Sequence, residues 1–195
     1  MLELLPYQIE GVRYLQTRRR AALFDEMRLG KTAQALTALP TAARAVVVCP
    51  KIAVRVWEDE ARLWRQDLVP VPLSGRQSFR WPEPGEIIIL NYEIMPEILS
   101  EAQGRVWLVA DEAHYLKSLG SKRTKLFRAL RRRVVAVGGS VWVLTGTPML
   151  KDPPDLWNVL AAAGLELSAF GSWPEFREAF HAKELEVKVT GGKMR

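Results

Sequence analysis

The chain has 195 residues, 48% of them hydrophobic, which is enough for one large domain or two small ones with a packed core. Its net charge of +6 favours an acidic partner such as nucleic acid. The single cysteine, Cys49, excludes an internal disulfide and a cysteine-built metal site. No stretch resembles a membrane span, and the N-terminus lacks the pattern of a signal peptide. We therefore expect no membrane contact and no secretion: the protein would be cytoplasmic in a bacterial or phage-infected cell, or nuclear in a eukaryote.

The excess positive charge is clustered in two arginine triplets, Arg18 to Arg20 and Arg131 to Arg133. The first precedes a predicted strand and the second lies late in a predicted helix. Both are typical of a solvated surface, and the second also suits the C-terminal end of a helix. Charge alone therefore favours nucleic acid only weakly.

The stretch from Ala21 to Leu39 has the pattern of a phosphate-binding P-loop. A short apolar run to Phe24 predicts a buried strand, and an alanine- and leucine-rich helix begins near Thr32. Backbone N–H groups and the positive end of the helix dipole form a concavity for phosphate oxygens in such a loop. We expect Lys31 to reach the β- and γ-phosphates and the Thr32 hydroxyl to bind Mg²⁺. The pattern departs from the usual one at Asp25, where a glycine is expected.

A second apolar run, from Val106 onward, ends abruptly in two acids and reads VWLVADEAH. This pattern predicts a central strand that carries carboxylates to the edge of a sheet where α/β proteins bind ligands. Asp111 could hold Mg²⁺ through water, and Glu112 could orient and deprotonate an attacking water. The alternative is a pair of exposed acids that cap the following helix.

A helix is predicted from Pro6 to Gln16, with Gln8 at its start. A glutamine amide both donates and accepts, which complements the edge of adenine. The alternative is an ordinary surface glutamine.

The next predicted strand, Ala45 to Cys49, ends at Pro50-Lys51 and is followed by a helix over 52–64. Lys51 lies at the turn between them, where it could contact a backbone phosphate, although an isolated surface lysine has the same pattern. A connection rich in proline and glycine then occupies 68–85.

A third buried strand is predicted from Glu86 to Leu90, with Asn91 and Tyr92 at its tip. We expect a helix to follow, from Glu93 or Pro96 to Gln103. An ordinary interpretation of the pair at the tip is helix capping by Asn91 and packing of Tyr92 on the sheet.

After a turn over 115–121, Ser121 is a candidate N-cap for a helix through Arg132. A strand over 141–144 follows, and its tip carries Thr145, Gly146 and Thr147, a composition that also suits an ordinary polar turn. Two helices are predicted near 155–163 and 174–182, and 183–195 has the pattern of a linker or tail.

The ordered motifs PYQIEGVRYL, DEMRLGKT, VVVCPK, ILNYE, DEAH and LTGTP resemble the amino-terminal motor lobe of superfamily-two helicases, and most closely the Swi/Snf-type DNA translocases. Asp25 itself supports the resemblance, because those proteins also carry aspartate there. The resemblance implies a RecA-like α/β domain over 1–182, with three layers and a mainly parallel central sheet. It covers the chain from Pro6 to about Leu160.

The resemblance also implies roles for individual residues. Gln8 would contact adenine, and the loop from Arg28 through Leu29 and Gly30 to Lys31 and Thr32 would bind ATP and Mg²⁺. Asp111 would serve the metal, and Glu112 would serve the attacking water. Duplex DNA would lie along Pro50, Lys51, Asn91 and Tyr92. Coupling of the nucleotide state to domain movement would involve His114, Thr145, Gly146 and Thr147.

Two departures from the family pattern are visible. Arg28 stands where the family usually has glycine, and no second lobe follows Leu160. We therefore expect the chain to be one lobe that binds nucleotide but hydrolyses it poorly without its partner lobe. An RNA-directed helicase lobe of the DEAH type and a non-catalytic nucleic-acid-binding module are the alternatives.

Overall fold

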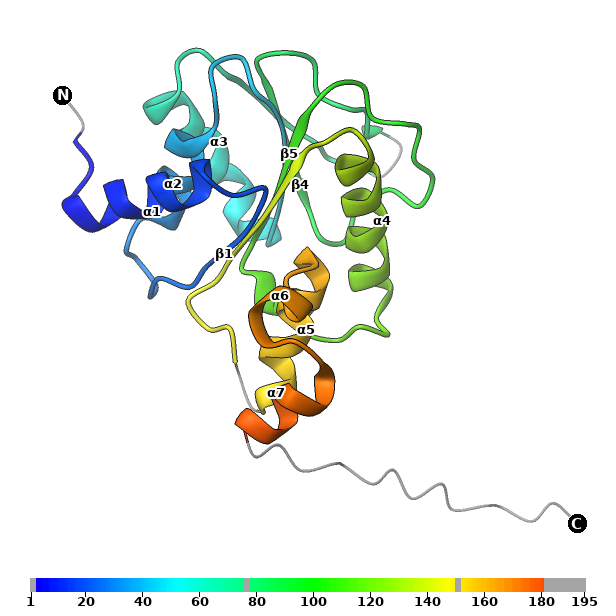
Figure 1. Ribbon diagram of the computed structural model, residues 1–195. Coiled ribbons are helices and arrows are strands. Elements are labelled where there is room, and N and C mark those ends of the chain that lie inside the picture. Colours follow the sequence, from blue (N-terminus) through cyan, green and yellow to red (C-terminus); the bar gives the residue numbers. More distant parts are fainter. Residues whose placement is uncertain (1–2, 76–77, 150–151, 181–195) are drawn as a thin grey trace, which may run out of the picture.

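The computed structural model describes residues 3–75, 78–149 and 152–180, and these form a parallel sheet covered by helices on both faces (Figure 1). The sheet has six strands in the order β1-β6-β5-β2-β4-β3, and every strand pair is parallel. The strands are β1 (Arg20–Leu23), β2 (Arg44–Cys49), β3 (Val69–Pro72), β4 (Glu86–Asn91), β5 (Val106–Asp111) and β6 (Ser140–Leu144).

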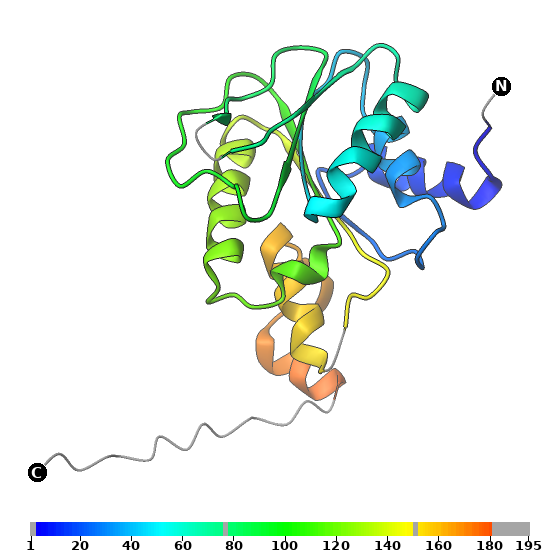
Figure 2. The ribbon, with the colours of Figure 1, turned by 180° about the vertical axis from the view of Figure 1, so that it is seen from behind.

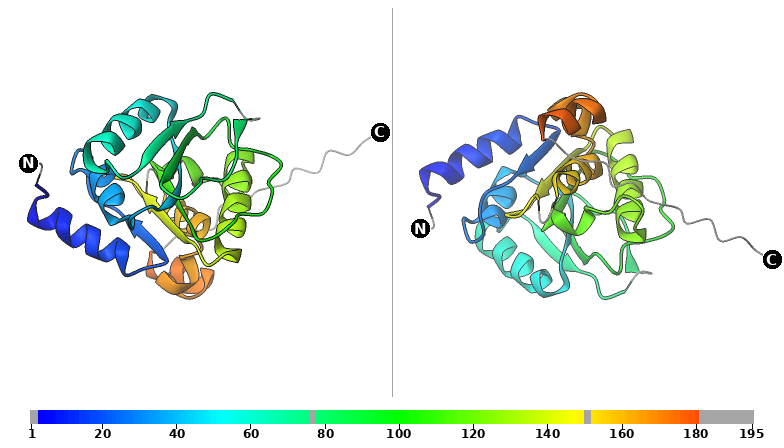
Figure 3. Two further views of the ribbon diagram at one scale, coloured as in Figure 1. Left: turned by 90° about the horizontal axis from the view of Figure 1, so that it is seen from above. Right: turned by 90° about the horizontal axis from the view of Figure 1, so that it is seen from below.

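An α-helix separates most successive strands, as is usual in parallel sheets, but β3, β4 and β5 follow one another through irregular connections. Viewed along the sheet, α1 to α3 cover one face, whereas α4 and α5 cover the other (Figures 2 and 3). The α-helices are α1 (Pro6–Gln16), α2 (Lys31–Ala38), α3 (Val54–Trp64), α4 (Lys122–Ala136), α5 (Pro153–Ala163), α6 (Glu166–Phe170) and α7 (Trp173–Ala179). Two short 3₁₀ helices, η1 (Lys51–Ala53) and η3 (Ala113–Leu116), follow β2 and β5.

The core consists of two layers, one on each face of the sheet. The central strand β2 reads RAVVVC, and its residues from Ala45 to Cys49 are completely buried, because helices cover both of its faces. Burial also raises the pKa of the Cys49 thiol well above its ordinary value, in keeping with the expected small apolar role. The predicted α/β fold with a mainly parallel sheet is therefore confirmed.

Ser121 caps α4 as predicted, with its hydroxyl accepting a 3.2 Å hydrogen bond from the Thr124 N–H. The helix expected between Glu93 and Gln103 is wrong: the structure has turns and bends there. Met95 is fully buried and Ala102 nearly so, so both fill the core from an irregular segment. Pro96 within that segment disfavours a continuous helix.

The structure adds an edge strand, β3, inside the connection predicted over 68–85. Its sequence VPVP contains two prolines, which a strand tolerates at a sheet edge because one side needs no N–H donors. At the other end of the chain, α6 was not predicted, and α7 ends at Ala179 rather than Ala182. The expected tail over 183–195 lies outside the described residues. Within the described ranges, no helix is long and apolar enough to cross a membrane.

Candidate nucleotide-binding site

The carboxyl ends of β1, β6 and β5 lie side by side and bring three loops together. The register pairs Leu144 of β6 with Leu23 of β1 on one side and with Asp111 of β5 on the other. The P-loop, the acidic pair and the Thr145–Thr147 turn therefore start at the same level of the sheet. Beside them lies a cavity of about 560 Å³, lined by Gln8, Met27, Arg28, Gly30, Lys31, Thr32, Ala33, Glu60, Leu63, Trp64, Asp111 and Glu112.

The side chain of Lys31 folds back onto the backbone of the P-loop. Lys31 begins α2, is only 7% exposed, and donates two 2.8 Å hydrogen bonds from Nζ to the carbonyl oxygens of Asp25 and Glu26. Gly30 and Arg28 have left-handed backbones with φ of 74° and 69°. Such a backbone favours glycine, so Arg28 carries local strain on an exposed side chain beside the cavity.

The aspartate that departs from the generic P-loop pattern is held by a buried glutamine. Gln34 of α2 is completely buried, and its Nε2 donates to Asp25 Oδ2 at 2.8 Å and to the Leu29 carbonyl at 3.2 Å. Gly11 of α1 makes room for this amide, because a Cβ there would lie 1.8 Å from Gln34 Oε1. Helix α1 thereby supports the shape of the loop.

Gln8 lies against the same loop, as its position at the start of α1 allows. Its Nε2 donates to the Leu29 carbonyl at 3.2 Å, and its Oε1 accepts from the Leu5 N–H at 2.9 Å. A Cβ on Gly30 would lie 2.4 Å from Gln8 Nε2. The side chain is therefore fixed at the mouth of the cavity, and contact with adenine stays a prediction.

Asp111 is enclosed by three hydrogen bonds. Its Oδ2 accepts from Trp57 Nε1 at 2.8 Å, its Oδ1 accepts from the Glu112 N–H at 3.0 Å, and its carbonyl accepts from the Tyr92 hydroxyl at 2.7 Å. Burial raises the pKa of Asp111, an effect that the Trp57 hydrogen bond partly offsets. The carboxylate therefore sits in one fixed rotamer at the floor of the cavity.

Glu112, the next residue after Asp111, has a left-handed backbone with a φ of 49° and makes different contacts from Asp111. Its Oε2 lies 3.2 Å from His114 Nδ1, and the hydrogen bond from His114 lowers the pKa of Glu112 in spite of partial burial. The same Nδ1 lies 3.1 Å from Thr145 Oγ1 and 3.2 Å from Thr147 Oγ1. The structure thus brings Glu112, His114 and both threonines into one polar cluster, with Glu112 ionised at neutral pH.

Gly146 connects this cluster to the P-loop. A Cβ at Gly146 would lie 3.0 Å from the Met27 backbone nitrogen and 3.3 Å from the Asp25 carbonyl oxygen. The turn between Thr145 and Thr147 therefore packs directly on the loop that would hold phosphate.

The donor chemistry of the cleft fits Mg²⁺ rather than a transition metal. The Thr32 hydroxyl and the Asp111 carboxylate are hard oxygen donors, and Mg²⁺ typically keeps several waters and uses only one or two protein oxygens. Among the described residues, no group of three or more His, Cys, Asp or Glu side chains could hold a metal alone.

The predicted nucleic-acid residues lie along the ends of β2 and β4, beside the nucleotide cleft. Pro50, Lys51 and Asn91 line a second cavity of about 450 Å³, together with Tyr115. Tyr92 is only 2% exposed and stacks under Tyr115, with ring centroids 5.3 Å apart. Its ring therefore belongs to the core, which matches the ordinary packing interpretation, and Tyr115 is the aromatic ring at the surface.

Trp57 and Gln34 belong to the site but were missed as functional residues. Trp57 is a buried residue of α3, and nothing in its local sequence predicts that its indole reaches Asp111. Gln34 is a polar residue on an otherwise apolar face of α2. That unusual position was the only local indication that its side chain has a specific partner. Both contacts arise only when separate elements pack together.

Residues 7–192 match a protein family described as the SNF2-related domain. Protein CHROMATIN REMODELING 19 of Arabidopsis thaliana is 30% identical over 80% of this chain and 24% of that protein. The DNA annealing helicase and endonuclease ZRANB3 of Bos taurus is 27% identical over 91% of this chain and 17% of that protein. The chain thus spans about a quarter or less of the length of these curated relatives.

The fold itself matches a solved structure, the SWI2/SNF2 ATPase core of Sulfolobus solfataricus in complex with dsDNA. The TM-score is 0.69 at 24% sequence identity, and the match covers 91% of this chain and 38% of that chain.

Proposed function

Because the chain belongs to the SNF2-related domain family, we propose that its cleft binds ATP with Mg²⁺ as half of a DNA-dependent motor. The observation that carries this proposal is the convergence of Lys31, Thr32, Asp111 and Glu112 on one cavity. A binding module without catalysis needs no such set, and this argues against the non-catalytic alternative.

Lys31 has to change partners when nucleotide binds. Its ammonium group now satisfies the Asp25 and Glu26 carbonyls, and phosphate oxygens would replace them as acceptors. The Thr32 hydroxyl and Asp111 would hold Mg²⁺, which neutralises charge on the phosphates when bound. Gln8 would contact adenine.

Glu112 is suited to orient the attacking water and take its proton. Its pKa is lowered by the His114 hydrogen bond, so the carboxylate is in the form that accepts a proton. His114 shares its Nδ1 with Thr145 and Thr147, whose turn packs on the P-loop. This cluster would transmit the state of the nucleotide to a neighbouring domain.

A second RecA-like lobe of the same protein would complete the site. An arginine supplied from another domain can be worth about 10³ to 10⁵ in phosphoryl-transfer rate. We therefore expect residues 1–182 to form one lobe that binds ATP but hydrolyses it slowly alone, with 183–195 leading toward the partner lobe. Fast, DNA-stimulated hydrolysis by this chain alone would contradict the need for a partner.

Duplex DNA is the proposed track, along Pro50, Lys51 and Asn91, with Tyr92 supporting the exposed ring of Tyr115. The relatives named above include a chromatin-remodelling protein and a DNA annealing helicase, and these names favour DNA over RNA as the track. Contacts to backbone phosphates predict binding that tolerates sequence changes and weakens steeply with salt. Equal stimulation by duplex DNA and RNA would favour the alternative.

The proposal is tested with Glu112→Gln in a protein that contains both lobes. The amide keeps the shape of the side chain but accepts no proton, so ATP should stay bound while turnover falls at least about 100-fold, the typical contribution of a general base. Glu101→Gln, at a side chain that is 90% exposed, is the matched control and should leave turnover unchanged. Normal turnover in Glu112→Gln would refute the assigned role of Glu112.

A further inference from the structure

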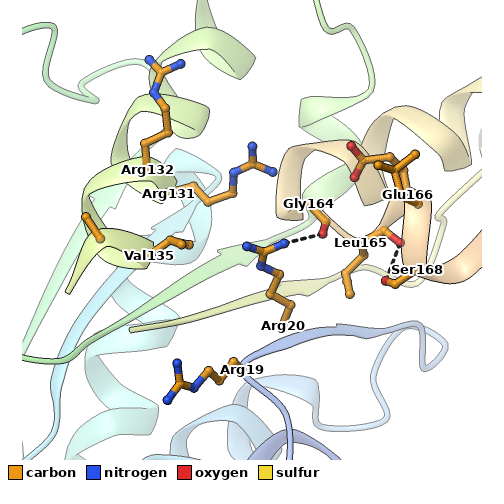
Figure 4. A pocket seen from close by; sticks show the side chains of 11 residues that line it. Arg19, Arg20, Arg131, Arg132, Val135, Gly164, Leu165, Glu166 and Ser168 are labelled. Atoms are coloured by element: carbon orange, nitrogen blue, oxygen red, sulfur yellow. Dashed lines mark hydrogen bonds between the residues drawn. The ribbon is translucent and has the colours of Figure 1, made fainter. Parts of the chain in front are cut away.

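Two arginine clusters that are far apart in the sequence meet near the amino-terminal end of β1. The nucleotide cleft lies at the other end of the strands, the carboxyl end. Arg19 and Arg20 lie at the start of β1, and Arg131 and Arg132 lie in the last turns of α4. With the segment after α5 they line a pocket of about 950 Å³ (Figure 4). The pocket and the P-loop lie at opposite ends of β1, whose four residues span roughly 10–13 Å. The pocket is therefore distinct from the proposed ATP site.

The two central arginines are held in place by main-chain carbonyl groups. Arg20 Nη1 donates to the Gly164 oxygen, and Arg131 Nη1 donates to the Ala161 oxygen, each at 2.9 Å. A guanidinium has five N–H donors, so most of them remain for a ligand. Figure 4 shows both guanidinium groups turned toward Gly164.

The two outer arginines extend away from the centre on different sides of the pocket, Arg19 from the position just before β1 and Arg132 from α4 (Figure 4). Within the described part of the chain, no hydrogen bond or ion pair engages either guanidinium group. A ligand that reaches all four arginines therefore has to be extended rather than compact.

The positive charge of this pocket is largely uncompensated. Among the described residues that line it, Glu166 is the only acid against four arginines. Burial lowers the pKa of Arg131, and the charges of Arg128, Arg20 and Arg132 lower it further, whereas Glu166 acts in the opposite direction. An anionic ligand would relieve this repulsion.

Part of the lining is apolar and open to solvent. Leu167 and Val135 are 66% and 37% exposed as whole residues, although both line the pocket. Neither inorganic phosphate nor a DNA backbone brings an apolar group to cover them. A protein segment that alternates acidic and apolar side chains satisfies both parts of the lining.

We propose that the pocket between β1, α4 and α6 is a docking site for an acidic peptide segment of a partner protein, with carboxylates on the arginines and an apolar side chain on Leu167 and Val135. Charge complementarity selects this class of ligand, and the site needs neither nucleotide nor DNA. Its failure and the failure of the proposed motor function are therefore independent.

The test uses fluorescence anisotropy of a labelled peptide of alternating aspartate and leucine, titrated with the 195-residue chain. The double variant Arg19→Ala/Arg132→Ala should weaken binding at least about tenfold, because two charge-assisted pairs are lost. Leu167→Ser, and a peptide with serine in place of leucine, should also weaken it. Arg133→Ala removes the same charge from the same helix outside the pocket and should have no comparable effect.

Three results would overturn the proposal. One is equal affinity for a peptide in which asparagine replaces aspartate. Another is binding that both pocket variants leave unchanged. The third is loss of duplex DNA affinity in Arg19→Ala/Arg132→Ala without any effect of Leu167→Ser on the peptide, which would assign the pocket to nucleic acid instead.

Discussion

The indole N–H of Trp57 donates a 2.8 Å hydrogen bond to Oδ2 of Asp111, and so helix α3 fixes a carboxylate at the tip of β5. Trp57 is 1% exposed and Asp111 is 8% exposed, so water does not replace this donor easily. The bond leaves Asp111 with a defined orientation toward the cavity. The side chain that we propose as a Mg²⁺ ligand is thus positioned by a residue that lies outside the six sequence motifs quoted above.

Trp57→Phe should destabilise the fold by about 1–3 kcal/mol, because it leaves a buried carboxylate oxygen without its donor. The measurement is urea unfolding at neutral pH. Trp64→Phe is the matched control: it removes an indole hydrogen bond from the same helix to Glu60, in a less buried place, and should cost less. The cost of Trp57→Phe should also shrink when Asp111 is alanine, in a double-mutant cycle. Additive effects of the two substitutions would show that the hydrogen bond contributes nothing.

Gly11→Ala should weaken nucleotide binding about tenfold without unfolding the protein. The new Cβ would lie 1.8 Å from Gln34 Oε1, so the amide must move and release Asp25 and Leu29 of the P-loop. The better helix propensity of alanine, about 1 kcal/mol, offsets part of the lost stability. Gly120→Ala, where a Cβ meets open space, is the control. Unchanged affinity in Gly11→Ala would mean that Gln34 does not shape the loop.

Asp111→Asn should stabilise the fold at neutral pH even though it removes a proposed Mg²⁺ ligand. Burial raises the pKa of Asp111, so its contribution to wild-type stability is fully present below the ordinary aspartate pKa and is lost as pH rises through the raised value. The stability gained by the asparagine variant should therefore grow between pH 4 and pH 7. Glu112, whose pKa is lowered, contributes in the opposite direction, and its contribution also changes in the variant because the two carboxylates repel one another. A difference in unfolding free energy that stays constant with pH would contradict the assignment.

Those parts of the site that lie immediately after a buried strand could be predicted from the sequence. The loop before Lys31, the acids at Asp111 and the Thr145 turn each follow a buried apolar run, and parallel pairing brings such tips to one edge of the sheet. The parallel α/β fold was predictable for the same reason.

Contacts between elements distant in the sequence were not predictable. The hydrogen bond from Trp57 to Asp111 depends on how α3 packs on β5, and the meeting of Arg20 with Arg131 depends on the pairing of β1 with β6. The segment around Met95 was wrongly predicted as a helix: Pro96 disfavours a continuous helix there, and the segment fills the core with Met95 and Ala102 while keeping an irregular backbone.

Binding of ATP by the cleft is measured most directly by isothermal titration calorimetry of the 195-residue chain with MgATP. The wild-type chain should bind one equivalent, and Lys31→Ala, with folding verified by circular dichroism, should bind at least about tenfold more weakly, since a charge-assisted contact to phosphate is lost. A folded wild-type chain that binds no MgATP, or binds it as tightly as Lys31→Ala, would contradict the assignment of this cleft.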